Sequence, residues 1–99
     1  MAYGIEIAPT ANDDLAAMKA FHRAGILDAI EKHLTHTPTA ISRSRIKRLH
    51  LLDSPAYRLR VGDYRVYYDV DEVSHTVIVL RILSKTASLD YLQGAGSEG

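Results

Sequence analysis

The spacing of apolar residues changes twice along the chain, and each change predicts a change of secondary structure. Apolar and polar residues alternate over residues 3–8, which predicts an opening β-strand. Helical spacing follows, and it predicts one helix capped by Thr10 or Asn12 and a second helix after Gly25. Pro38 marks the end of the helical region, because a proline disfavours helix in the residue before it.

Alternation returns after Pro55 and dominates the second half of the chain. Residues 57–61 and 64–70 both alternate, and the Gly-Asp pair between them is a turn signal. This pattern predicts a β-hairpin. β-branched residues then dominate residues 76–83, which predicts a further and more buried strand.

The predicted elements combine into a small α+β domain with the order β-αα-βββ. A helical pair is expected on one face of a mainly antiparallel sheet. Residues 39–55 show no clear period and are assigned to a connector, and a short helix is predicted to end at Leu92. A chain of this length closes one core, so residues 1–93 are predicted to form a single domain and residues 94–99 a flexible tail.

Composition narrows the classes of function. The 99 residues carry a net charge of zero and include no cysteine, which excludes disulfides, thiolate metal sites and cysteine nucleophiles. No apolar run reaches the roughly 18 residues that read as a membrane-spanning helix, and the first residues lack the pattern of a secretory signal. We therefore expect a cytoplasmic protein that makes no contact with a membrane.

Charge is unevenly distributed along the neutral chain. Residues 43–65 carry seven arginines and lysines but only two aspartates. The basic residues of this segment are Arg43, Arg45, Lys47, Arg48, Arg58, Arg60 and Arg65. Such a segment forms either a solvated charged surface or a local site for a polyanion such as a nucleic acid.

The predicted hairpin concentrates part of this charge. Period-two alternation in its first arm places Arg58 and Arg60 on one face, roughly 6.5–7 Å apart, and the apolar residues on the other. Arg65 comes to the same region across the turn. Three guanidinium groups repel one another unless an anion binds between them or nearby aspartates neutralise them. Tyr67 is the ring best placed on this face to stack on a base.

The same segment carries a family resemblance. Residues 57–69 read YRLRVGDYRVYYD and resemble the hairpin of the RelE/ParE superfamily of bacterial toxins. The resemblance covers nearly the whole chain, including a basic connector at residues 45–49 and the segments 77–85 and 90–92. It is closer to the RelE-like members. It implies the toxin of a type II toxin–antitoxin system, with a cognate antitoxin as partner and with no metal or other cofactor.

Three activities are compatible with this resemblance. RelE-like members are endoribonucleases that cleave mRNA in the ribosomal A site without a metal and so inhibit translation, and this is our first hypothesis. The alternatives are a ParE-like inhibitor of DNA gyrase and a relative that binds an antitoxin but has lost toxicity. The partners implied are the antitoxin with either the ribosome and mRNA or DNA gyrase.

RNA cleavage needs the 2′-hydroxyl deprotonated, the charge on the phosphate stabilised and the 5′-oxygen protonated. By position in the family pattern, the implied catalytic residues are Arg60, Arg65, Lys85 and Tyr91. The implied RNA- or phosphate-binding residues are Arg45, Lys47, Arg48, Arg58, Arg60, Tyr67 and Arg81. Arg81 interrupts an apolar strand, so it either joins this site or pairs with an acid. Thr86-Ala-Ser stands where many RelE-like members carry a further arginine or histidine.

Overall fold

The computed structural model describes residues 2–50 and 52–97, and in it a five-stranded sheet separates helices on its two sides. The elements are β1 (Gly4–Ile7), α1 (Pro9–Ala16), α2 (Ala20–Leu34), β2 (Ile46–Arg48), β3 (Tyr57–Val61), β4 (Tyr64–Asp71), β5 (Thr76–Ser84) and α3 (Lys85–Ser97). The α+β class predicted from the sequence is confirmed.

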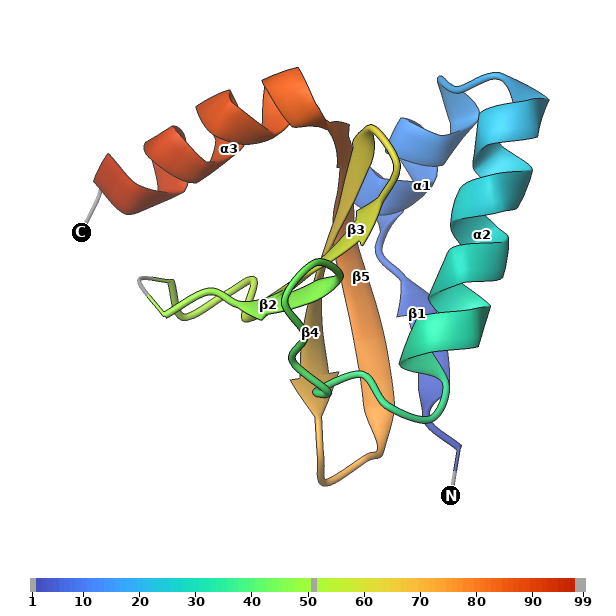
Figure 1. The fold of residues 1–99 in the computed structure, drawn as a ribbon, viewed down its shortest axis with the longest axis vertical. Helices are drawn as coiled ribbons and strands as arrows, with labels where there is room; N and C mark the ends of the chain where they lie inside the picture. The colour runs from blue at the N-terminus through green and yellow to red at the C-terminus, as the bar shows by residue number, and fades with distance from the viewer. Residues whose placement is uncertain (1, 51, 98–99) are drawn as a thin grey trace.

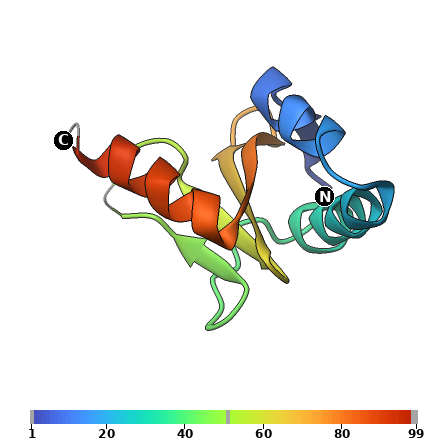
Figure 2. The same ribbon diagram turned by 90° about the horizontal axis from the view of Figure 1, so that it is seen from above.

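The strands lie in the order β1-β5-β4-β3-β2. β1 runs parallel to β5, and all other neighbours are antiparallel. Helices α1 and α2 cover one side of the sheet, and α3 leaves β5 toward the other side (Figures 1 and 2). The mainly antiparallel sheet and the helical pair on one face are therefore confirmed.

The helical region is divided differently from the prediction. α1 begins at Pro9, with Ala8 as N-cap, and neither Thr10 nor Asn12 caps it. Proline suits this first helical position, because its missing N–H would have no intrahelical partner there. The break between the helices lies at residues 17–19, and Gly25 lies inside α2 instead of separating two helices.

Two elements extend beyond what the sequence predicted. The connector contains a strand, β2, which pairs with β3 and is continued by a hydrogen bond from the Arg60 N–H to the Arg45 carbonyl (2.8 Å). A strand of three residues is too short to produce a readable alternation. The last helix continues past Leu92 to Ser97, so residues 94–97 of the predicted tail belong to α3. Residues 98–99 lie outside the described residues.

The core lies between the sheet and the pair α1–α2. It is built from Ala11, Leu15, Ile26, Ile30, Leu34, Ile46, Leu59, Val66, Tyr68, Val77, Val79 and Ile82. Every second residue of β3 and of the first part of β4 contributes to it, so the residues between them face the other side of the sheet. No helix in the described parts of the chain is long and apolar enough to span a membrane.

Tyr68 ties the sheet to the connector that follows α2. Its side chain is fully buried, and its hydroxyl donates a hydrogen bond of 2.6 Å to the carbonyl of Pro38. Without this donor the carbonyl would lose its partner in an apolar environment, which is the costly way to lose a hydrogen bond. The bond therefore fixes the return of the chain from α2 toward β2.

We expect Tyr68→Phe to lower the free energy of unfolding by about 1–3 kcal/mol, because the Pro38 carbonyl loses its donor. Urea denaturation at pH 7 measures this change. Tyr64→Phe is the matched control, because the Tyr64 hydroxyl has no hydrogen-bond partner within residues 2–50 and 52–97. Equal stability of the Tyr68→Phe protein and the wild type would contradict this account of the core.

The wild type and the Tyr68→Phe protein should also differ in how their stability depends on pH. Burial raises the pKa of Tyr68 above its ordinary value of 10.0. Above that pH the unfolded chain loses the phenol proton while the folded chain keeps it, so stability falls as pH rises. The stability advantage of the wild type over Tyr68→Phe should therefore shrink by up to about 1.4 kcal/mol per pH unit above pH ~10. Parallel stability curves for the two proteins would contradict it.

Candidate functional site

The strand register gathers basic residues on the side of the sheet opposite α1 and α2. Lys47 pairs with Arg58, which pairs with Tyr67, and one step further along the sheet Arg60 pairs with Arg65. Paired residues point to the same side. Arg45 lies beside Arg60, to which its carbonyl is hydrogen-bonded. We call Arg45, Lys47, Arg58, Arg60 and Arg65 the basic face.

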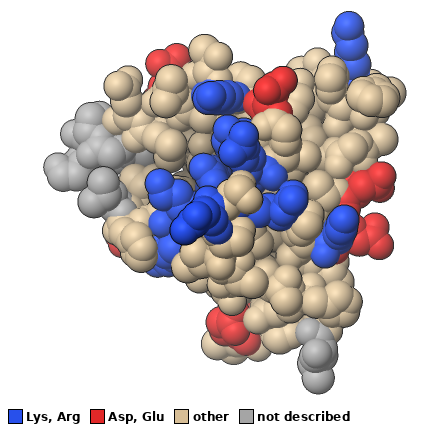
Figure 3. Space-filling view, viewed as in Figure 1, with Lys and Arg blue, Asp and Glu red and all other residues tan. Residues whose placement is uncertain are grey.

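Figure 3 shows the result on the surface. Lysine and arginine atoms gather in one patch in the middle of this view, over β2 and β3 and beside α3, while the acidic atoms lie toward its edges. The side chains of Arg45, Lys47 and Arg60 are exposed. A neutral chain thus presents a concentrated positive surface, as its uneven charge distribution predicted.

Acidic side chains do not neutralise this surface. Within the described residues the single ion pair closer than 4 Å joins Arg81 to Asp14, and neither belongs to the basic face. Asp69 accepts a hydrogen bond from the Ala56 N–H, and Asp71 accepts hydrogen bonds from the backbone of its own turn. Neither aspartate forms an ion pair with an arginine of the basic face.

Arg58 lies at the centre of the uncompensated charge. Its side chain is half-buried, and its Nε is buried with no hydrogen-bond partner in the described structure. Burial lowers the pKa of Arg58, and the neighbouring charges of Arg65 and Arg60 lower it further, while the nearby Tyr67 opposes them. A buried donor surrounded by like charges is destabilising, and an anion bound there would relieve both problems.

Arg65 is held more tightly than the other members of the basic face. It is only 9% exposed, and its Nη1 donates hydrogen bonds of 3.0 Å to the carbonyls of Gly62 and Tyr64. These bonds fix the guanidinium against the β3–β4 turn. Gly62 has a φ of 56°, in the left-handed region that favours glycine, so a side chain at this position would strain the turn that holds Arg65.

The aromatic side chains differ from the expectation. Tyr67 faces this side of the sheet but is 1% exposed, because the Tyr91 ring of α3 lies 5.1 Å from it. The prediction that Tyr67 faces a ligand is therefore wrong. Tyr91 is half-buried and closer to solvent, and burial raises its pKa, with Arg81 opposing the shift. Its phenol is thus protonated at neutral pH.

The side chain of Arg81 forms an ion pair with Asp14. Its Nε and Nη2 donate to the two carboxylate oxygens of Asp14 at 2.9 and 3.1 Å, and the Ile82 N–H donates to the same carboxylate at 2.9 Å. The Arg81 guanidinium also lies over the Tyr91 ring, 5.7 Å from its centre. Of the two roles left open for Arg81, pairing with an acid is the one observed. Sequence reasoning missed Asp14, because the two residues lie 67 positions apart.

Arg48 is also excluded from the basic face. It pairs in register with Tyr57, which packs against the core, so it points to the opposite side from Lys47. Its Nη1 donates to the carbonyls of Leu49 and Ala56, and its guanidinium lies 5.3 Å from the centre of the Tyr57 ring. The expectation that Arg48 binds phosphate is wrong in this arrangement.

Lys85 begins α3 at the turn end of the basic face. Its backbone N–H donates to the carbonyl of Asp63 (2.8 Å), and its side chain is exposed. Ser88, one turn further, is buried and its hydroxyl lacks a partner in the described structure.

Among the described residues no group of three or more acidic or histidine side chains could hold a metal ion. The arrangement is thus suited to binding a polyanion through guanidinium and ammonium groups.

Comparison with known proteins agrees with this architecture. Residues 5–88 match the model of the family described as "ParE toxin of type II toxin-antitoxin system, parDE". No curated protein matches the chain. Among solved structures, a chain of the toxin–antitoxin complex RelBE2 from Mycobacterium tuberculosis is 24% identical, with a TM-score of 0.71, and the match covers 85% of this chain and 99% of that one.

Two further structures share the fold. A chain of the RelB–RelE antitoxin–toxin complex from Methanococcus jannaschii is 26% identical, with a TM-score of 0.62, over 87% of this chain and 96% of that one. A mutant of the E. coli toxin RelE in the free state is 17% identical, with a TM-score of 0.61, over 99% and 97%. The family model spans most of the chain, and the fold agrees with it. This chain therefore belongs to the ParE toxin family of type II toxin–antitoxin systems, within the RelE/ParE superfamily.

Proposed function

We propose that this toxin is an mRNA endoribonuclease that acts on the ribosome and that a cognate antitoxin holds inactive. The observation that carries the proposal is the buried, unpartnered Nε of Arg58, which lies near the charges of Arg60 and Arg65, with no acid paired to any of the three in the described structure. Such a site favours a bound phosphate. Similar folds were solved in complex with antitoxins, which supports the same kind of partner here.

The proposed chemistry is a metal-free cleavage in which the 2′-hydroxyl of one nucleotide gives its proton to a water molecule, its oxygen attacks the adjacent phosphorus to form a 2′,3′-cyclic phosphate, and the 5′-oxygen leaves with a proton. Charge accumulates on the phosphate oxygens, where Arg58 and Arg65 are positioned to stabilise it. Arg60 is exposed and contacts the flanking backbone. The Tyr91 phenol is protonated at neutral pH, as an ordinary tyrosine is, and burial raises its pKa further, so Tyr91 serves as the proton donor to the leaving oxygen. Lys85 completes the proposed site at the start of α3.

A second candidate is inhibition of DNA gyrase. The family model that matches the chain is named for ParE, and the segment after β5 carries Thr86 and Ser88 in place of further cationic residues. Of these two, Thr86 is exposed and Ser88 is buried. In this case the basic face would bind an acidic protein surface and no bond would be cleaved.

Induction of the wild-type protein in cells separates the two candidates. We expect cuts inside translated codons, mapped by primer extension, and unchanged DNA supercoiling. Arg58→Ala should reduce cleavage about 100-fold, because one group that stabilises the transition-state charge is lost. Lys32→Ala, which removes an exposed cation of α2, is the matched control and should cleave normally. Intact transcripts with altered supercoiling would overturn the nuclease proposal in favour of gyrase.

Binding of single-stranded RNA gives a second measurement, independent of cleavage. Arg60 is exposed on the basic face, so Arg60→Ala removes one phosphate contact without opening the core. The slope of log K against log salt concentration should fall in magnitude by about 0.7. Lys32→Ala should leave the slope unchanged. An unaltered slope in Arg60→Ala would show that the RNA backbone does not contact this face.

A further inference from the structure

Two buried side-chain polar atoms have no hydrogen-bond partner within the described residues. One is the Nε of Arg58, which the proposed function uses, and the other is the hydroxyl oxygen of Ser88 in α3. Ser88 is only 4% exposed, so bulk water does not solvate its hydroxyl. A buried hydroxyl without a partner destabilises the folded protein, and the packing of α3 alone therefore does not account for this serine.

The helix offers the Ser88 hydroxyl a partner that it does not use. A serine inside a helix commonly donates to the backbone carbonyl four positions earlier, which here is the carbonyl of Ser84. No such bond forms in the described structure. Ser88 does not cap the helix either, because the Ser84 hydroxyl accepts the hydrogen bond from the Ala87 N–H at the start of α3 (3.1 Å). The Ser88 hydroxyl can thus donate to a bound ligand.

Both unpartnered atoms lie on the side of the sheet that carries the basic face, where Figures 1 and 2 show α3. Tyr91 follows Ser88 by three positions on the same face of α3, and its ring packs on that of Tyr67, with centres 5.1 Å apart. Tyr67 pairs in register with Arg58 of β3. Ser88 therefore faces this part of β4 from the helix, and Arg58 borders it from the neighbouring strand.

Arg65 adds a fixed positive charge to the same region. It lies two positions before Tyr67 on β4, on the same side of the sheet, and bonds of 3.0 Å to two backbone carbonyls hold its Nη1 in place. α3 begins at this end of the sheet, where its first N–H is bonded to the β3–β4 turn (2.8 Å). Ser88 thus lies along α3 between that turn and the contact of Tyr91 with Tyr67.

Two unused donors beside uncompensated positive charge select an anionic acceptor. The Nε of Arg58 and the hydroxyl of Ser88 can each donate one hydrogen bond. A phosphate has several oxygens that accept from separate donors, and hydrogen bonds to a charged acceptor are strong. A hydroxyl supplies such a bond without adding charge to arginines that already repel one another.

We propose that Ser88 is a phosphate-binding residue of the RNA site, and that its hydroxyl and the Arg58 Nε–H donate to oxygens of the same phosphate. This role rests on the proposed function, which supplies RNA as the ligand. It adds a neutral donor from α3 to a site whose cations come mainly from the sheet. It also accounts for the buried hydroxyl, which the fold leaves without a bond.

The first test removes the hydroxyl and measures both RNA binding and stability. The probe is a single-stranded 2′-O-methyl RNA oligonucleotide, which cannot be cleaved through its 2′-oxygen, and binding is followed by fluorescence anisotropy at low salt. Ser88→Ala should raise the dissociation constant about tenfold, because a hydrogen bond to a charged acceptor is lost. Its melting temperature should rise by a few degrees, because an unsatisfied buried hydroxyl is replaced by a better helix former. Thr86→Ala removes an exposed hydroxyl from the same helix and should bind as the wild type does.

A double-mutant cycle tests whether Ser88 and Arg58 hold the same phosphate. Arg58→Lys keeps the positive charge but removes the Nε–H. Its effect on affinity should be smaller in the Ser88→Ala protein than in the wild type, because that phosphate is already less tightly held. Arg60→Ala changes an exposed cation further along the basic face and should weaken binding by the same factor in both backgrounds.

Wild-type RNA affinity in Ser88→Ala, or equal weakening in Thr86→Ala, would overturn the proposal. A lower melting temperature with unchanged affinity would assign the hydroxyl to a buried structural water and would also overturn it. Weaker binding of the antitoxin encoded beside the toxin, with RNA affinity unchanged, would assign the hydroxyl to a carboxylate of that partner, with the same consequence. If the wild type cleaves no mRNA in cells but Ser88→Ala still loses RNA affinity, the nuclease proposal fails and the phosphate contact stands.

Discussion

Alternation in the β3–β4 hairpin is the constraint on which the rest of this molecule depends. Leu59 and Val66 must enter the core beneath α1 and α2, and this forces their neighbours along each strand onto the opposite side of the sheet. These neighbours include Arg58 and Arg60 beside Leu59, and Arg65 beside Val66. A slip of one residue would bury three guanidinium groups and expose the core, so the packing energy of the fold holds the like charges together.

A second set of contacts divides the side of the sheet that carries the arginines. Asp14 of α1 binds Arg81 of β5 through both carboxylate oxygens, and Arg81 in turn lies over the Tyr91 ring of α3. Tyr91 covers Tyr67. The part of this surface over β4 and β5 is therefore closed by α3, and the part over β2 and β3 stays open to a ligand. One acid at the end of α1 thus removes one arginine from the charged surface and supports the helix that borders it.

The spacing of apolar and polar residues predicted the structure correctly wherever neighbours along the chain determine it. The hairpin strands, the shared face of Arg58 and Arg60 and the α+β class all follow from period two and a turn signal. This spacing did not predict the contacts of side chains whose partners lie far away in the sequence. Arg48 belongs to the basic segment of the sequence and Arg81 interrupts an apolar strand, but the backbone carbonyl of Ala56 and the carboxylate of Asp14 determine what these two side chains bind. The continuity of α2 through a glycine depends on packing of the whole helix, which overrides a single unfavourable propensity.

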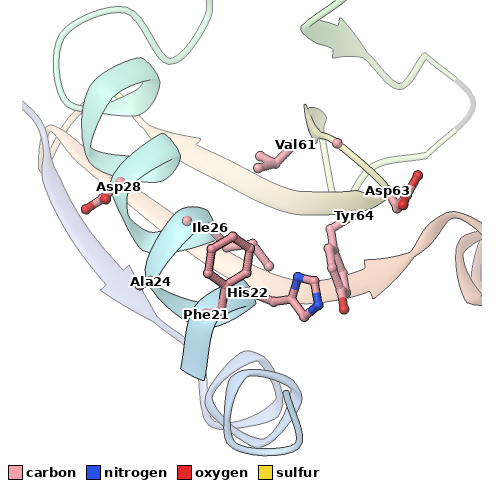
Figure 4. A pocket seen from close by; sticks show the side chains of 10 residues that line it. Phe21, His22, Ala24, Ile26, Asp28, Val61, Asp63 and Tyr64 are labelled. Atoms are coloured by element: carbon pink, nitrogen blue, oxygen red, sulfur yellow. The ribbon is translucent and has the colours of Figure 1, made fainter. Parts of the chain in front are cut away.

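Although the net charge of the protein is zero, the two sides of its sheet differ in charge. The sheet surface carries Arg58, Arg60 and Arg65 without paired acids. A groove between α2 and the β3–β4 turn (Figure 4) is lined by Asp28 and Asp63 and by no basic residue. A partner that contacts both sides must itself be mixed in charge, acidic where it meets the sheet and basic where it meets the groove. Such a partner discriminates its toxin from other polycations, because a uniformly acidic chain would match the sheet and be repelled at the groove. The RNA of the proposed function is uniformly anionic, so this charge distribution favours its binding on the sheet surface over binding in the groove.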